Sequence, residues 1–238
     1  MNNKAFKCKY ILKLVMKQKI IAFEFDGIFI RSEARNAANK RWLKVMADLL
    51  KDPAILKGDY EKNKFSKFFR IMQKYLKLDP KDAKERAILT KAVNGLYQIL
   101  LLSEVTKLKE KLTIKETLDL AKKLKFAYKL ALITATPEWA LNLILKKLKI
   151  DKLFNYIYKV PTEKEPNKDE VIKKFVSDHG KPCCLVGKEL RTLEICEKLE
   201  IPFILYNINK YEKEVYLKAK YQASDAEELR RAIKKIKS

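Results

Sequence analysis

The chain has 238 residues, and 47% of them are hydrophobic, which is enough to bury the core of one domain with an insertion. Five glycines and seven prolines exclude a low-complexity chain. The net charge of +23 fits nucleic acid, an anionic membrane or phosphorylated ligands as partners. The lysines are dispersed along the whole chain, however, which is more typical of an AT-rich or heat-adapted genome than of a nucleic-acid-binding surface.

Metal-ligand spacing is absent from the sequence around its single histidine, His179, and its four cysteines, Cys8, Cys183, Cys184 and Cys196. We therefore expect reduced thiols and a cytoplasmic protein. Residues 1–15 are basic with a short apolar patch. This segment is too short to span a membrane and lacks a small-residue cleavage site, so we interpret it as an N-terminal extension of unknown role.

The first predicted strand, residues 20–23, is an apolar run of the kind that is buried on both faces of a sheet. Glu24 and Asp26 follow it and point to the same side, and Gly27 allows the chain to turn away. Ligands bind at the carboxyl ends of strands in open α/β sheets, so the paired acids form a candidate site. The alternative is an ordinary solvated strand end.

Residues 33–112 show helical periodicity throughout. Apolar side chains recur at helical spacing in three segments, which are residues 33–49, 60–78 and about 79–108. The aromatic positions among them are typical of the core of a helical bundle. We predict an all-helical insertion over residues 33–112.

From Thr113 onward, predicted helices and strands alternate. Helices are expected over residues 113–125 with a capping box from Thr113 to Glu116, then over 137–149, 168–177, 190–199 and 225–236, the last capped by Ser224. Strands are expected over residues 128–134, 156–160, 182–186 and 202–206, the last of the sheet. This alternation predicts an α/β fold: a three-layer, Rossmann-like parallel sheet built from residues 16–32 and 113–238.

The strand ends resemble the four motifs of the haloacid dehalogenase (HAD) superfamily, in particular its phosphoglycolate-phosphatase-like members. EFDGIFIRSE resembles the first motif, LALITATPE the second, NKDEVIKKF the third and CLVGKELRTLEICEKLEIPFI the fourth. The resemblance covers most of residues 17–238. It implies a HAD-like core in which the helical insertion forms a cap over the site.

The resemblance also implies roles for individual residues. Glu24 stands at the position of the nucleophile, Asp26 at that of the general acid and base, and Thr134 with the backbone N–H of Ala135 at the phosphate pocket. Lys168 matches the lysine of the third motif and would complete the phosphate pocket with Thr134 and Ala135. Lys164 is a second candidate for this lysine.

Several of these positions depart from the family pattern. Glu24 replaces an aspartate, and its extra methylene moves the carboxylate by roughly 1 Å, a misplacement that can cost a hundredfold in rate. Lys188 and Thr192 stand where acids normally complete the Mg²⁺ site, and Arg31 replaces another usual acid. Glu189 is adjacent but would have to be redirected. We therefore expect no metal in the degenerate site.

We expect the Lys188 ammonium to take the place of the metal charge by pairing with Glu24 or Asp26, the alternative being that it extends into solvent. The resulting hypothesis is a HAD-like protein that has lost Mg²⁺-dependent phosphatase activity and binds a phosphorylated ligand or acts as a regulatory module. One alternative is an active phosphomonoester hydrolase that uses Mg²⁺. Another is a basic nucleic-acid-binding protein. The oligomeric state is not predicted.

Overall fold

The structure is a computed structural model that describes residues 19–51, 53, 77, 79, 82–161, 164, 167–206 and 218–237. The predicted extension, residues 1–15, lies outside the described residues. So does the predicted helix over residues 60–78, apart from residue 77.

A parallel sheet forms the centre of the molecule. Its strands are β1 (Ile20–Phe23), β2 (Lys129–Pro137), β3 (Tyr156–Val160), β4 (Cys184–Gly187), β5 (Phe203–Tyr206) and β6 (Tyr221–Ala223). Among the described residues their order is β3-β2-β1-β4-β5-β6, and every pair is parallel. The prediction that residues 202–206 form the last strand is wrong, because Tyr221–Ala223 pairs with β5. Three residues are too few to show a strand pattern in the sequence.

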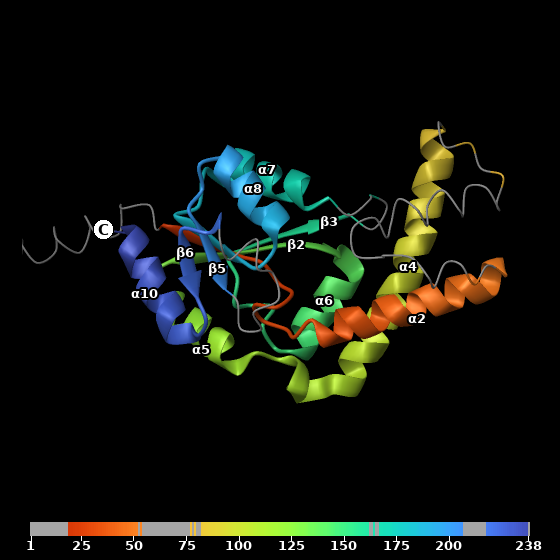
Figure 1. Cartoon of the computed structure of the whole chain (residues 1–238), viewed down its shortest axis with the longest axis horizontal. Coiled ribbons are helices and arrows are strands. Elements are labelled where there is room, and N and C mark those ends of the chain that lie inside the picture. Colours follow the sequence, from red (N-terminus) through yellow and green to blue (C-terminus); the bar gives the residue numbers. More distant parts are fainter. Residues whose placement is uncertain are drawn as a thin grey trace, which may run out of the picture.

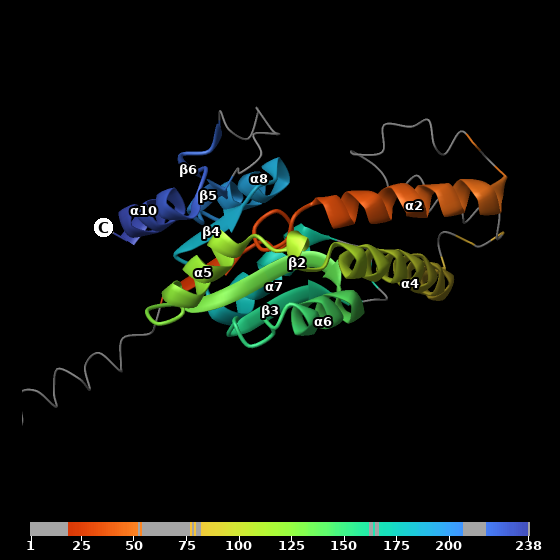
Figure 2. The ribbon, with the colours of Figure 1, turned by 90° about the horizontal axis from the view of Figure 1, so that it is seen from below.

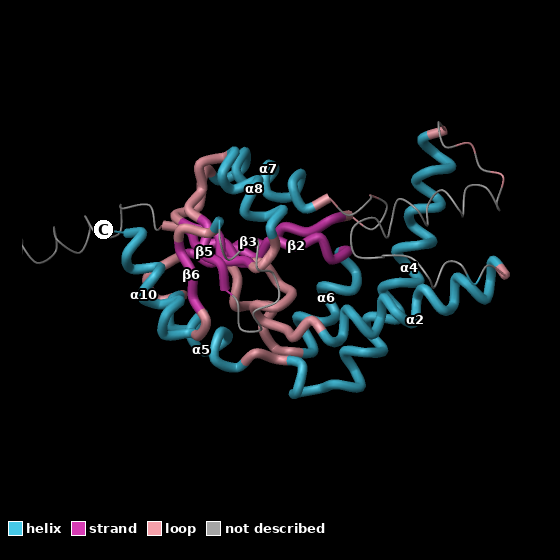
Figure 3. Tube along the Cα trace, viewed as in Figure 1, coloured by secondary structure: helices cyan, strands magenta, loops and turns pink. Residues whose placement is uncertain are grey.

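Helices cover both faces of this sheet. They are α5 (Lys115–Leu124), α6 (Glu138–Lys147), α7 (Lys168–His179), α8 (Leu190–Lys198) and α10 (Ala226–Lys237). Helices α7 and α8 lie on one face, and α5, α6 and α10 lie on the other (Figures 1 and 3). Along β1, Ile21 and Phe23 pack into the cluster with α5 and α6, whereas Ile20 and Ala22 pack into the cluster with α7 and α8. Such alternation follows from the two-residue period of a strand. The predicted three-layer, Rossmann-like fold is confirmed.

Two long helices form the cap. They are α2 (Glu33–Leu50) and α4 (Ala83–Leu108), and α4 continues into the short 3₁₀ helix η2 (Lys109–Leu112). They lie side by side and extend away from the sheet (Figure 2). Trp42 and Met46 of α2 pack in the same apolar cluster as Leu89 and Val93 of α4. The same cluster also includes Phe23 of β1 and Ile144 of α6, so the apolar side chains that join α2 to α4 are continuous with the core of the sheet.

The chain enters and leaves the cap through two segments that pair with each other. The backbone N–H of Arg31 donates to the carbonyl of Leu112 (2.8 Å), and the N–H of Ile114 donates to the carbonyl of Phe29 (3.0 Å). Ile30 and Thr113 form an antiparallel bridge between them. The chain therefore enters and leaves the cap at adjacent points, and α4 of the cap also packs against α6 of the core, where Gln98 accepts from the N–H of Ala140. The limits of the cap at residues 33 and 112 stay a prediction.

Two predicted helix caps are wrong. Thr113 does not cap the following helix, because it pairs with Ile30 and α5 begins only after Ile114, without a side-chain cap. At α10 the cap is Asp225, whose carboxylate accepts from the N–H of Glu228 (2.8 Å). Ser224 instead donates its own N–H and hydroxyl to the Glu228 carboxylate. Tertiary pairing with Ile30 thus decided the first case, whereas at α10 the adjacent Asp225 took the capping position through a local contact.

No helix among the described residues is long and apolar enough to cross a membrane.

Candidate functional site

The candidate site lies where β1 and its two neighbours end. Strand β1 is central, with β2 on one side and β4 on the other, and all three run in the same direction. Their carboxyl ends therefore meet at one edge of the sheet, where ligand sites of α/β folds occur. Glu24 follows β1, Thr134 lies in the extended end of β2, and Lys188 follows β4. Lys168, the first residue of α7, reaches the same edge.

Glu24 is buried, with 2% of its surface exposed, and both of its carboxylate oxygens accept hydrogen bonds. Oε1 accepts from the ammonium of Lys168 (3.0 Å) and from the hydroxyl of Thr192. Oε2 accepts from the backbone N–H of Lys188 (3.1 Å). Because a buried carboxylate must be hydrogen-bonded and paired, these three donors explain how a charged group is tolerated here.

Gly187, the last residue of β4, makes room for this carboxylate. A Cβ atom at Gly187 would lie 2.8 Å from Cδ of Glu24 and 2.9 Å from a ring carbon of Phe203. Real Cβ contacts are not that short, so only glycine lets the longer glutamate side chain lie over the end of β4. The Glu24 side chain is thus directed toward β4 and α7.

Lys168 joins two carboxylates. Its ammonium lies 3.0 Å from Oε1 of Glu24 and 2.5 Å from Oε2 of Glu189. Burial raises the pKa of Glu24 above its ordinary value and outweighs the opposing effect of Lys168. Burial alone would lower the pKa of Lys168, but the two carboxylates raise it above its ordinary value. Burial would likewise raise the pKa of Glu189, but Lys168 and Arg35 lower it to about 2.

Asp26 has looser surroundings, which come mainly from the cap. Arg35 of α2 places its guanidinium 3.8 Å from Asp26 and 3.4 Å from Glu189. Burial, and then the charge of Asp26, raise the pKa of Tyr97 on α4 above its ordinary value. The Asp26 side chain keeps 16% of its surface exposed. Arg35 and Tyr97 were not among the predicted site residues, because nothing in a helical pattern shows which turn of a cap faces the sheet.

The predicted ion pair between Lys188 and Glu24 or Asp26 is wrong. The ammonium of Lys188 donates to the hydroxyl of Ser32 (2.6 Å), and its aliphatic stem passes over Gly27, where a Cβ would lie 2.5 Å from Cδ of Lys188. Lys188 contacts Glu24 through its backbone N–H only. The cation that pairs with Glu24 is Lys168, because Glu24 is turned toward α7. Lys188 is also not fully extended into solvent.

The predicted phosphate pocket has a local hydrogen-bond pattern. Thr134 accepts from the backbone N–H of Thr136 (3.0 Å) and donates to the Thr136 hydroxyl (2.9 Å). Strand β2 continues past the predicted end at Thr134 to Pro137, so Ala135 lies within the strand. The roles of Thr134 and Ala135 stay a prediction. Lys164 has only backbone contacts among the described residues, which leaves Lys168 as the lysine at Glu24.

The residues around Glu24 do not fit a Mg²⁺ ion. Magnesium requires oxygen ligands in an octahedral arrangement. Here the donors that face the Glu24 carboxylate are an ammonium, a hydroxyl and a backbone N–H. Lys188 and Thr192, at the positions of the family's metal-binding acids, contribute two of these three donors. A cation would have to displace donors that already compensate the buried charge.

Among the proteins compared with this chain, only solved structures are similar to it. The sequence matches no protein-family model and none of the curated proteins with which it was compared. Many solved structures are similar, and three of those that cover nearly the whole chain illustrate the likeness. A haloacid dehalogenase-like hydrolase from Streptococcus pneumoniae is 15% identical, with a TM-score of 0.61 over 90% of this chain and 97% of that one. The chain has a HAD-like fold.

Two more of these similar structures come from other organisms. A β-phosphoglucomutase from Clostridium difficile is 14% identical and has a TM-score of 0.61, covering 92% of this chain and 98% of that one. A HAD phosphatase from Thermococcus onnurineus is 18% identical and has a TM-score of 0.59, covering 90% of this chain and 96% of that one. Identities this low establish the HAD-like fold with its helical cap, whereas chemistry has to be inferred from the site.

Proposed function

We propose that this HAD-fold protein binds a phosphorylated small molecule and has lost the Mg²⁺-dependent phosphatase reaction. One observation carries the proposal: both oxygens of the Glu24 carboxylate are held by hydrogen bonds from Lys168, Thr192 and the N–H of Lys188. A carboxylate nucleophile needs a free lone pair directed at phosphorus. Three of the roughly four lone-pair sites of the Glu24 carboxylate accept these hydrogen bonds, which leaves a single one, on Oε2, for attack.

Freeing Glu24 for attack would be unfavourable. The side chain would have to leave its ion pair with Lys168 while remaining in a buried position. Separating the partners of a buried ion pair is strongly destabilising, because it leaves a buried charge uncompensated. In addition, a phosphoryl-transfer transition state relies on Mg²⁺ to neutralise its charge, and the donor set at Glu24 does not fit that ion. Both effects oppose hydrolysis.

The same site is suited to hold an anion. The site gathers as many positive as negative side chains. The carboxylates belong to Glu24, Asp26 and Glu189, and the cations belong to Arg35, Lys168 and Lys188. The ammonium of Lys188 donates to a neutral hydroxyl, so it keeps donors for a ligand. The guanidinium of Arg35 is 3.4 Å or more from its carboxylates, so it too can turn toward a phosphate.

The experiment measures binding and turnover on the same protein. We expect inorganic phosphate to bind in isothermal titration calorimetry with an affinity that EDTA does not change, and p-nitrophenyl phosphate to remain intact with Mg²⁺ present. Replacing the ammonium in Lys188→Met should weaken phosphate binding about tenfold, as expected for one charge-assisted hydrogen bond. The matched control is Lys198→Met, because Lys198 is exposed at the end of α8. It should leave binding unchanged.

An active hydrolase is the main competing outcome, and the loose environment of Asp26 favours it. Asp26 is partly exposed and 3.8 Å from its nearest cation, so it keeps the freedom that a general acid and base requires. Mg²⁺-dependent turnover that disappears in Asp26→Asn would overturn the loss of activity. Absence of both binding and turnover would overturn the binding function. The phosphoglycolate-phosphatase-like subgroup, the cytoplasmic location and nucleic-acid binding stay predictions.

A further inference from the structure

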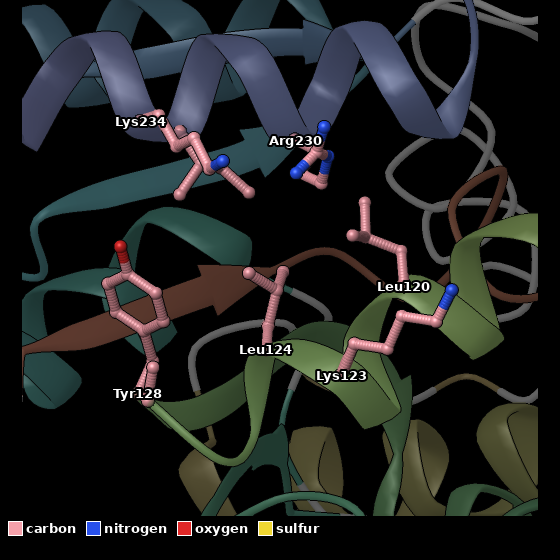
Figure 4. Close-up of a pocket in the computed structure, with 8 residues that line it drawn as sticks. Leu120, Lys123, Leu124, Tyr128, Arg230 and Lys234 are labelled. Carbon is pink, nitrogen blue, oxygen red and sulfur yellow. The ribbon is translucent and has the colours of Figure 1, made fainter.

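A groove lies between α5 and α10, away from the candidate site. It has a volume of about 620 Å³, within the range of small-molecule sites. Its apolar lining comes from Leu120 and Leu124 of α5, Ile233 of α10 and the ring of Tyr128 (Figure 4). Tyr128 directly precedes β2, so the groove lies toward the amino end of that strand, whereas Glu24 follows the carboxyl end of β1.

The rim of this groove is positively charged. Lys123 of α5 faces Arg230 and Lys234 of α10 across it (Figure 4). Arg230 is bonded to Glu227, which lies on the same helix (2.6 Å). In the described part of the chain neither Lys123 nor Lys234 forms an ion pair, although the charge of Lys234 acts on Glu227 of the same helix. An apolar floor with two ammonium groups that form no ion pair at its edge is complementary to a molecule with an alkyl body and an anionic end.

A further apolar side chain lies next to the groove. Phe126 is 90% exposed and belongs to the same turn as Ala127, which lines the groove. Because Phe126 is exposed beside the groove, it enlarges the apolar surface that a hydrophobic ligand would cover.

We propose that this groove binds a free anionic amphiphile, that is, a single alkyl chain that ends in a carboxylate. The chain would lie against Leu120, Leu124 and Ile233, and the carboxylate would lie between the ammonium groups of Lys123 and Lys234. This site is separate from the proposed phosphate site and does not depend on it.

Charge disfavours the other occupants. Residues 1–18 contain five lysines and no acidic residue, so they would be repelled by the rim. A second copy of the chain carries the same net charge of +23. A flat bilayer surface meets exposed side chains and does not fill a depression, whereas a single alkyl chain does.

The test uses the full chain and decanoate below its micelle-forming concentration. We expect saturable, one-to-one binding in calorimetry, with amide shifts in a ¹H–¹⁵N spectrum confined to α5, α10 and the turn before β2. Hexanoate, with four fewer methylenes, should bind about a hundredfold more weakly if the chain is buried. Decanol, which lacks the charge, should bind about tenfold more weakly than decanoate.

Two variants separate the apolar from the charged contribution. Ala127→Trp fills the groove from an exposed turn and should abolish decanoate binding. Lys123→Glu with Lys234→Glu should weaken it at least about tenfold, and the control pair Lys173→Glu with Lys198→Glu, exposed on α7 and α8, should not. The phosphate affinity should be the same in Ala127→Trp as in the unmodified chain.

Three outcomes would overturn the proposal. One is absence of saturable decanoate binding, and another is binding that Ala127→Trp leaves unchanged. The third is binding only to vesicles of anionic lipid and not to free decanoate, which would assign the surface to a membrane. Equal affinity for decanol and decanoate would overturn the role of the rim lysines.

Discussion

The two carboxylates after β1 are two residues apart, yet they lie in very different surroundings. Glu24 is held from the core by Lys168, Thr192 and a backbone N–H, and only 2% of its surface is exposed. Asp26 faces the cap, and its nearest cation, on Arg35, is 3.8 Å away. The core half of the site, which is Glu24 with its donors, is thus built for stability. The cap half, which is Asp26 with Arg35, keeps the freedom that ligand binding needs.

The largest expected effect tests the core half. Lys168→Met would leave the Glu24 carboxylate buried beside two uncharged donors, so we expect the free energy of unfolding to fall by about 4 kcal/mol. Urea unfolding measures it. Lys174→Met, which breaks an exposed ion pair with Asp178 on the same helix, should leave the stability nearly unchanged. Equal effects of the two variants would show that Glu24 does not depend on Lys168.

A second prediction concerns the space under Glu24. In Gly187→Ala the new methyl group would collide with Glu24 and Phe203, which should lower the free energy of unfolding by about 3 kcal/mol. Thermal unfolding provides the measurement. Gly95→Ala is the control, because Gly95 lies within helix α4 and has open space around its Cβ position. That variant should stabilise the protein by about 0.5 kcal/mol. A tolerated alanine at residue 187 would contradict the described position of Glu24.

The pH dependence separates Glu189 from Glu24. The pKa of Glu189 is lowered from 4.5 to about 2, so its ionised form stabilises the fold above pH 4.5, and this contribution is lost as the pH falls toward 2. Between pH 6 and pH 3 the stability difference between the unmodified chain and Glu189→Gln should shrink by about 2 kcal/mol. The raised pKa of Glu24 acts with the opposite sign, because the fold disfavours its ionised form. A difference that stays constant across this range would contradict the coupling of Glu189 to Lys168.

The smallest expected effect tests the cap half. Arg35→Met removes contacts of 3.4 and 3.8 Å from a side chain that is 33% exposed, so we expect a loss of about 1 kcal/mol in urea unfolding. Phosphate affinity should fall in the same variant if Arg35 turns toward the ligand. A loss as large as that of Lys168→Met would remove the distinction between the two halves.

The fold was predictable from the sequence because its signals are local and repeated. Apolar strands alternating with helices, and a long helical segment after the first strand, are sufficient to predict a capped parallel sheet. Strand β6 was missed because Tyr221–Ala223 is too short to have a period. The cap at Thr113 was wrong because the same residue is used in the bridge to Ile30, a tertiary contact that a local motif cannot reveal.

The site was predictable only in part. The spacing of Glu24 and Asp26, and the motif around Lys168, indicated which strand ends meet. The partner of each charge was not predictable, because side-chain direction decides it. Lys188 was assigned to Glu24 from its position in the fourth motif, but its stem passes over Gly27 to Ser32. Arg35 and Tyr97 come from the cap, whose orientation depends on packing between distant helices.

The paired segments at the base of the cap have a consequence for the modularity of this chain. Ile30 and Thr113 bridge to each other, and the backbone bonds on either side tie Arg31 to Leu112 and Phe29 to Ile114. The two ends of the insertion are therefore held at neighbouring points, and beyond them α4 packs against α6 of the core, where Gln98 accepts from the backbone N–H of Ala140 (2.9 Å). Insertions are tolerated best where the chain ends are close together. A tight turn from Arg31 to Leu112 would close the same ladder and leave the sheet continuous, but it would expose the apolar face of α6 that α4 covers, so any shorter insertion would need a replacement for that cover.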